Sequence, residues 1–231
     1  IEFSGNYTEQ IFHPLLLQRL KPFNLLRFSG WQKEQYASSS LVRDWFLNRV
    51  STVNQTQNVP TGIAYEYMIE LSNRLNTSVW FSIPQYYSSD YLIHLVALIK
   101  QRLHGNAIVY FEYSNFVAYN DVGTRTREAF AKLEQEFGAE WRSSRLVLVM
   151  SLTNWYYLPY YVNNFANNLT LVDAIAIQGW YGEEQGFIDP NYNVLQVPML
   201  TVEKIVNLTR QSSLNIEVLN HMLYQQVKAS Y

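Results

Sequence analysis

Residues 107–115 read Ala-Ile-Val-Tyr-Phe-Glu-Tyr-Ser-Asn, a β-rich apolar run that ends in polar residues. Apolar side chains occupy both alternating positions of its first half. This pattern is typical of a strand that is covered on both faces, as in a parallel sheet. Four other short runs share this character, and they are residues 25–28, 79–83, 146–151 and 174–178. We therefore predict five buried strands.

Amphipathic stretches separate these runs and predict helices over residues 65–75, 89–103, 124–137, 201–210 and 215–228. Alternation of strand and helix predicts an α/β fold. No glycine-rich phosphate turn follows the first strand, so we favour a TIM-type (β/α) barrel over a doubly wound sheet. Because only five strands are recognisable, we expect the barrel to be incomplete in this chain. We expect one domain over residues 1–231, forming a segment of a larger protein.

Composition excludes several classes of protein. The chain has 231 residues, of which 16% are aromatic, and disordered chains are poor in such residues. It contains no cysteine, which removes disulfides and thiolate chemistry. A net charge of −2 argues against nucleic acid as a partner. No apolar run approaches the roughly 20 residues of a membrane span. The four histidines form no metal-binding motif, so we predict neither a metal site nor a cofactor.

Five Asn-X-Ser/Thr sequons occur, about twice the number that the composition predicts by chance. Their excess favours a secreted, extracellular glycoprotein with covalent N-glycans. The candidate attachment sites are Asn6, Asn54, Asn76, Asn168 and Asn207.

Aromatic and amide side chains follow the predicted strands at their carboxyl ends, where barrel enzymes place their chemistry. Sugar rings stack on aromatic faces, and their hydroxyl groups bond to amides and carboxylates. These residues therefore predict a carbohydrate-binding groove, and its candidate members are Trp31, Tyr113, Asn115, Trp180 and Tyr181.

Residues 60–75, 79–84 and 109–115, together with residues 12–14 and 20–31 upstream, resemble a family of glycoside-hydrolase-like (β/α)8 barrels. The similarity extends over about residues 10–185. In that family, the stretch that matches residues 109–115 contains the run Glu-Tyr-Ser-Asn-Glu. The resemblance implies that the last Glu of this run is the general acid/base at the end of a barrel strand.

The chain departs from the family pattern at the residues that matter for catalysis. Phe116 stands where the resemblance places the acid/base, and phenylalanine transfers no proton. Gly30 and Tyr119 replace an aspartate and a tryptophan of the pattern. A retaining glycosidase also needs a second carboxylate about 5–5.5 Å from the first. The resemblance places that group on a seventh strand, which we do not expect this chain to reach.

Glu112 and Glu183 are the nearest candidates for a replacement carboxylate. Glu112 lies four residues before Phe116 on the same predicted strand. An even offset keeps both residues on one face, so Glu112 is expected to point into the barrel but far below its mouth. We predict that Glu112 is buried and paired with an interior arginine such as Arg27.

These observations favour a catalytically degenerate, glycoside-hydrolase-like barrel with a structural role in an extracellular assembly, through self-association or other extracellular proteins. Two alternatives stay open. One is an active retaining glycosidase with a relocated acid/base, and the other is a carbohydrate-binding module that binds oligosaccharides.

Overall fold

A computed structural model describes residues 11–32, 49–57, 62–84, 87–113, 122–152 and 171–177. The chain divides into two compact units, residues 1–151 with 159–176 and residues 152–158 with 177–231. The single domain expected over residues 1–231 stays a prediction. Nearly all of the described residues belong to the first unit, and the predicted helices over residues 201–210 and 215–228 lie outside them.

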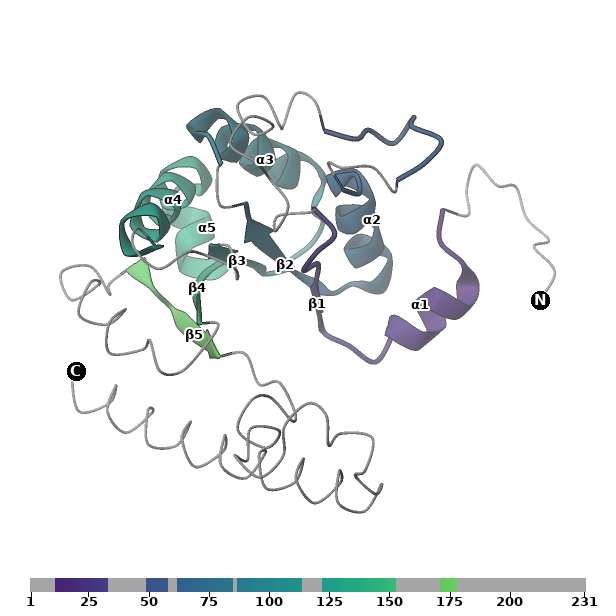
Figure 1. The fold of residues 1–231 in the computed structure, drawn as a ribbon. Coiled ribbons are helices and arrows are strands. Elements are labelled where there is room, and N and C mark those ends of the chain that lie inside the picture. Colours follow the sequence, from purple (N-terminus) through teal and green to yellow (C-terminus); the bar gives the residue numbers. More distant parts are fainter. Residues whose placement is uncertain are drawn as a thin grey trace, which may run out of the picture. The chain divides into compact units, whose positions relative to one another are not determined.

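Helices and strands alternate through the first unit (Figure 1). The elements are α1 (Pro14–Leu20), β1 (Leu25–Arg27), α2 (Tyr65–Leu75), β2 (Ser78–Ile83), α3 (Ser89–Arg102), β3 (Val109–Tyr113), α4 (Val122–Phe137), α5 (Ala139–Ser144), β4 (Leu146–Leu152) and β5 (Ala174–Ile177). All five predicted strands are present, and so are the three predicted helices within the described residues. The short helices α1 and α5 were not predicted.

The strands form one sheet in the order β1-β2-β3-β4-β5. Registers between neighbours from β1 to β4 are parallel, so that Leu26 pairs with Val79, Val79 with Val109, and Val109 with Leu146. The α/β class is therefore confirmed as a parallel sheet alternating with helices. Closure of this sheet into a barrel stays a prediction.

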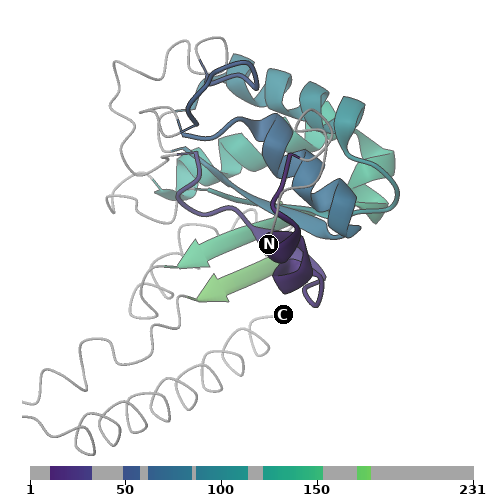
Figure 2. The same ribbon diagram turned by 90° about the vertical axis from the view of Figure 1, so that its right-hand side faces the viewer.

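Helices α2, α3 and α4 lie on the same side of the sheet (Figures 1 and 2). The side chains of Phe81 and Phe111 point to this side, because Phe81 contacts Tyr65 of α2 and Phe111 contacts Phe137 of α4. Both phenylalanines are fully buried. Burial of such apolar side chains, at about 25 cal/mol per Å², is the main force that joins the helices to the sheet.

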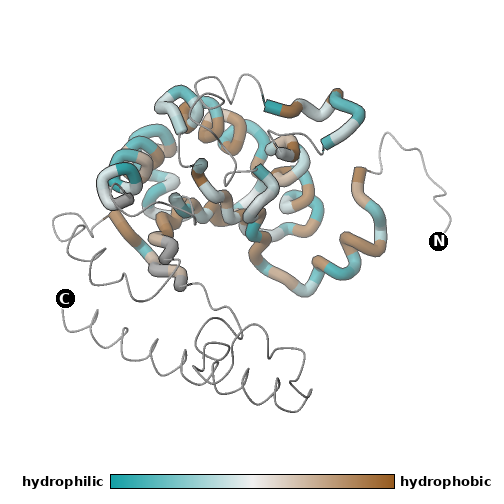
Figure 3. Tube along the Cα trace, in the orientation of Figure 1, coloured by the Kyte–Doolittle hydropathy of each residue, from teal (hydrophilic) through white to brown (hydrophobic). Residues whose placement is uncertain are grey.

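The three helices are amphipathic, and hydrophilic and hydrophobic residues alternate along them (Figure 3). Ser88 caps α3 by accepting a hydrogen bond from the Tyr91 backbone N–H at 3.1 Å. Gly138 directly follows the last residue of α4 and ends the helix with a φ of 80°. Helices α1 and α5 differ from these three, because none of their residues is buried.

Side chains at the alternate strand positions point to the opposite side of the sheet, since successive residues of a strand face opposite sides. We call this side the inner face, and define it by Arg27, Trp80, Ser82, Tyr110 and Glu112. In a closed (β/α) barrel the corresponding face lines the interior.

The segment before α2 approaches the end of β1 closely. The Ile63 backbone N–H donates a hydrogen bond to the Trp31 carbonyl oxygen at 2.8 Å. Gly62 has a φ of 84°, and a Cβ atom there would overlap the Trp31 carbonyl oxygen and lie 2.8 Å from two backbone carbons of Gln32. Only glycine combines this conformation with this contact.

We predict that Gly62→Ala lowers the free energy of unfolding by more than about 2 kcal/mol, because strain from the left-handed conformation adds to the backbone overlap. Gly105→Ala is the matched control, since Gly105 has a φ of 61° but nothing within 4 Å of its Cβ position. Its loss is expected to be about 1–2 kcal/mol. Urea unfolding of both variants measures the difference, and equal losses would contradict the close contact at Gly62.

Candidate functional site

The candidate catalytic carboxylate Glu112 lies on the inner face and is fully buried. The guanidinium of Arg27 donates to both carboxylate oxygens, from Nη2 to Oε1 and Oε2 at 2.7 Å each. Arg27 Nε donates a third hydrogen bond to Oε1 at 3.1 Å. The predicted pair between Glu112 and Arg27 is thus present, but the arginine is not interior, because its side chain is 36% exposed while that of Glu112 is fully buried. Such bidentate contacts are among the strongest that a carboxylate makes.

Ser82 completes the surroundings of this carboxylate. Its hydroxyl group donates to Glu112 Oε1 at 2.5 Å. The parallel register places Ser82 directly opposite Glu112, so neighbouring strands supply both residues at the same level of the sheet. Four hydrogen bonds therefore converge on one buried carboxylate and occupy both of its oxygens.

Aromatic rings extend the cluster sideways across the sheet. The Arg27 guanidinium carbon lies 4.9 Å from the centroid of the Trp80 ring. Trp80 stacks on Tyr110 with 5.8 Å between ring centroids and an interplanar angle of 21°. The register explains this row, because Arg27 pairs with Trp80 and Trp80 pairs with Tyr110. The sequence patterns did not predict this row.

Tyr113 was predicted to line a carbohydrate groove, and this prediction is wrong. Tyr113 follows Glu112 directly, so its side chain points to the opposite side of the sheet, toward the helices. It is only 3% exposed, and its ring meets that of Tyr87 edge to face at 5.9 Å. A ring buried in this way offers no face to a sugar.

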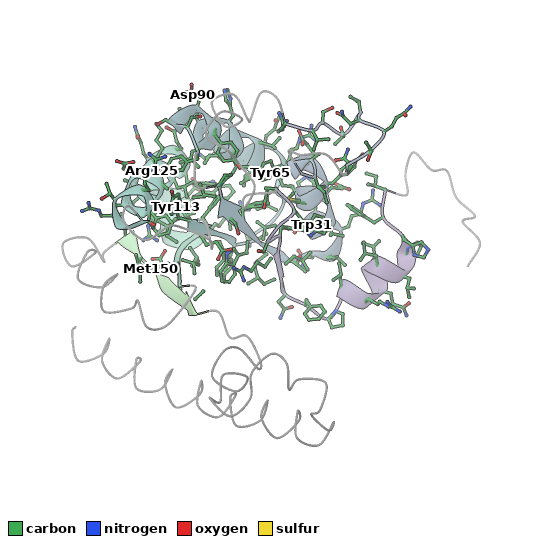
Figure 4. All side chains as sticks on the ribbon, in the orientation of Figure 1. Trp31, Tyr65, Asp90, Tyr113, Arg125 and Met150 are labelled. Carbon is green, nitrogen blue, oxygen red and sulfur yellow. The ribbon has the colours of Figure 1, made fainter. Side chains whose placement is uncertain are left out.

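Arg125 of α4 joins this aromatic pair (Figure 4). Its guanidinium lies 4.6 Å from the centroid of the Tyr87 ring, and the Tyr87 hydroxyl group donates to the Arg125 carbonyl oxygen at 3.2 Å. Burial raises the pKa of the Tyr87 hydroxyl well above its ordinary value. Tyr87 thus stays neutral, and the cluster connects the segment before α3 to the first turns of α4.

Trp31 is the groove candidate that the structure places beside a cavity. Its ring contacts Phe28 at 5.0 Å, and its side chain lines a cavity of about 740 Å³ along α2. We call this cavity the α2 groove. Residues from four of the described ranges line it, and they are Ile11, Phe12, Trp31, Thr52, Asn54, Gln55, Gln57, Ile63, Glu66, Tyr67, Glu70 and Arg102. The sequence did not predict the groove, because the residues that line it are far apart in the chain.

The other candidates of the groove and the catalytic position lie outside the described residues. These are Asn115, Phe116, Trp180, Tyr181 and Glu183.

Two of the five candidate glycosylation sites fall within the described residues. Asn54 is exposed in the loop that precedes α2, and Asn76 is exposed at the end of that helix, where it has a φ of 52°. Exposure makes both accessible, but attachment of a glycan to either stays a prediction. Asn6, Asn168 and Asn207 lie outside the described residues.

Two kinds of feature, a cluster of metal ligands and a membrane-spanning helix, are not found among the described residues. Among these residues, no three histidine, aspartate or glutamate side chains gather as metal ligands would. None of the helices described there is both long enough and apolar enough to cross a membrane.

Comparison with protein-family models, curated proteins and solved structures finds no significant match for this chain.

We predict that Arg27→Met lowers the free energy of unfolding by about 3–5 kcal/mol, because it leaves the Glu112 carboxylate buried without its counter-charge. The double variant Arg27→Met/Glu112→Met should recover most of that loss. Arg74→Met is the control, since Arg74 pairs with Glu70 while both side chains are about one-third exposed. Its cost should stay below about 1 kcal/mol.

Urea unfolding of these variants tests the pair. Equal losses for Arg27→Met and Arg74→Met would show that the buried ion pair contributes no more than an exposed one.

Proposed function

We propose that this chain is a secreted glycoprotein built on a glycoside-hydrolase-like α/β sheet, and that it serves a structural role outside the cell without hydrolysing sugars. The observation that carries the proposal is the state of Glu112. It is the candidate carboxylate closest in sequence to the position where the resemblance expects an acid/base, and it is committed to Arg27 and Ser82.

A general acid must hold a proton, touch the leaving oxygen and release the proton during the reaction. Glu112 cannot touch a leaving oxygen in the described fold. It is fully buried, and its two oxygens accept four hydrogen bonds from Arg27 and Ser82. Its chemistry therefore supports a role in holding β1, β2 and β3 together.

The sequence supplies the complementary argument. Phe116 occupies the position at which the resemblance expects the acid/base, and its ring has no ionisable proton. Loss of a general acid or base costs a rate factor of about 10²–10⁴. With Glu112 committed to the sheet, an active enzyme would depend on a carboxylate elsewhere, such as Glu183.

Extracellular location is supported by the excess of sequons. Asn54 and Asn76 both lie on exposed positions of the first unit, where a glycan is tolerated without disturbing the buried core. Glycans of this kind are bulky and solubilising. A protein that carries several of them suits a role in a matrix, wall or filament.

We predict no turnover above background on a panel of aryl glycosides, and none for Phe116→Glu, because a single restored carboxylate lacks its partner. Release of the aryl group is followed by absorbance over long incubations. Robust hydrolysis by Phe116→Glu alone would contradict the missing partner. Wild-type turnover that disappears in Glu112→Gln or Glu183→Gln would identify an active glycosidase with a relocated acid/base.

Intact-mass measurement of protein from its native source should show a mass above that of the bare polypeptide. Treatment with an amidase that releases N-glycans should remove the excess and convert each occupied Asn to Asp, which peptide mapping then locates. Asn54 and Asn76 are expected among the converted residues. A bare polypeptide mass before treatment would contradict the proposed secretory route.

A further inference from the structure

The α2 groove combines the features that proteins use to hold a sugar. Its volume of about 740 Å³ lies within the range of about 300–1,000 Å³ that small-molecule sites occupy. Aromatic rings, carboxylates and side-chain amides all line it. One of the amides belongs to Asn54, the asparagine of an Asn-Gln-Thr sequon.

The aromatic side of the groove is held in place by contacts around it. The Phe12 and Tyr67 rings meet edge to face with 6.5 Å between centroids. The Tyr67 hydroxyl group donates to the Thr52 carbonyl oxygen at 3.1 Å. Phe12, Tyr67 and Trp31 are each neither buried nor fully exposed, and all three line the groove. Apolar faces of sugar rings pack on such surfaces.

The acidic side carries an unused acceptor. Glu66 Oε1 accepts a hydrogen bond from Arg49 Nη2 at 2.5 Å. Glu66 Oε2 is buried, and it has no hydrogen-bond partner among the described residues. A buried acceptor without a donor is costly, by about 1–3 kcal/mol. This oxygen is shielded from solvent, so a ligand reaches it only if the Glu66 side chain moves.

Asn54 is oriented beside these walls. Its side-chain oxygen Oδ1 accepts hydrogen bonds from the Ser51 backbone N–H at 3.1 Å and from the Ser51 hydroxyl group at 2.9 Å. These bonds fix the plane of the amide and leave Nδ2, the atom to which an N-glycan is attached, for the sugar.

The loop that carries Asn54 is itself tied to the start of α2. Gln57 Nε2 donates to the Ser51 carbonyl oxygen at 3.0 Å, and Gln57 Oε1 accepts from the Ala64 backbone N–H at 3.0 Å. Ala64 is the N-cap residue of α2. The attachment point is therefore fixed relative to the groove.

We propose that the first N-acetylglucosamine of an Asn54-linked glycan folds back into the α2 groove. Its ring and acetyl group pack on Phe12, Trp31 and Tyr67. The proposal rests on the glycosylation that the proposed function includes. It makes the glycan a part of the fold that joins the segment before α1, the Asn54 loop and α2.

Asn76 provides an internal control. It is exposed at the other end of α2, and it is not among the residues that line the groove. A glycan on Asn76 therefore has no comparable surface beside it, and its sugars should extend into solvent.

The test uses secreted protein whose glycans are trimmed to a single N-acetylglucosamine. NMR should show the acetyl methyl of the Asn54 sugar shifted upfield by aromatic rings, with nuclear Overhauser contacts to Trp31 or Tyr67. The methyl of the Asn76 sugar should stay at the position found in unfolded protein. Phe12→Ala should reduce the Asn54 shift, while Phe23→Ala, at a ring that is 56% exposed outside the groove, should not.

Thermal unfolding of the isosteric variants Asn54→Asp and Asn76→Asp gives a second readout, because aspartate keeps the side-chain oxygen but accepts no glycan. Asn54→Asp should lower Tm by about 2–4 °C, the shift expected of one modest contact in a chain of this length, and Asn76→Asp should lower it less.

Three negative results have different meanings. If Asn54 carries no glycan while another sequon does, only this proposal is overturned. If no sequon carries a glycan, the glycoprotein part of the proposed function is overturned as well. If Asn54 is glycosylated but its acetyl methyl has the unfolded-state shift and no aromatic contacts, only the docking in the groove is overturned.

Discussion

The bidentate ion pair between Arg27 and Glu112 is the interaction on which the rest of the described fold depends. It joins β1 to β3 across β2, and Ser82 of β2 donates to the same carboxylate. A buried carboxylate is expensive unless it is paired and hydrogen-bonded. The three strands must therefore keep a single register for the pair to form, so the interaction specifies their alignment in addition to any stability that it contributes.

The two faces of the sheet follow from this alignment. Apolar side chains such as Phe81 and Phe111 point to the helices. The even-numbered residues of β2 and β3 face the other way and form the inner face, with its row of Arg27, Trp80 and Tyr110. The same alternation turns Tyr113 toward the helices, where it packs, and Glu112 toward the inner face, where it is paired with Arg27. Glu112, the candidate acid, is thereby held by Arg27 and Ser82, whereas a glycosidase would need its acid free to meet the substrate.

Sequence patterns predicted the strands well, because each described strand contains a short run rich in apolar residues, although the inner-face residues Arg27, Trp80 and Tyr110 are not fully buried. The Arg27–Glu112 pair was predictable too, since a carboxylate within such a run requires a cation. Tyr113 was misplaced although its odd offset from Glu112 would have indicated the helix side. Helix α1 was missed because its leucines pack in no core, and the α2 groove was missed because Phe12, Trp31 and Tyr67 meet only in the folded chain.

Carboxylate footprinting tests the central claim, that Glu112 is a structural group of the sheet, most directly. A carbodiimide couples an amine to accessible carboxylates of the folded protein, and peptide mass mapping reports the rate at each site. Glu112 should stay unmodified until the protein unfolds, while Glu128 and Glu140, which are exposed, should react quickly. Modification of Glu112 in the folded protein at the rate of Glu128 would contradict the account.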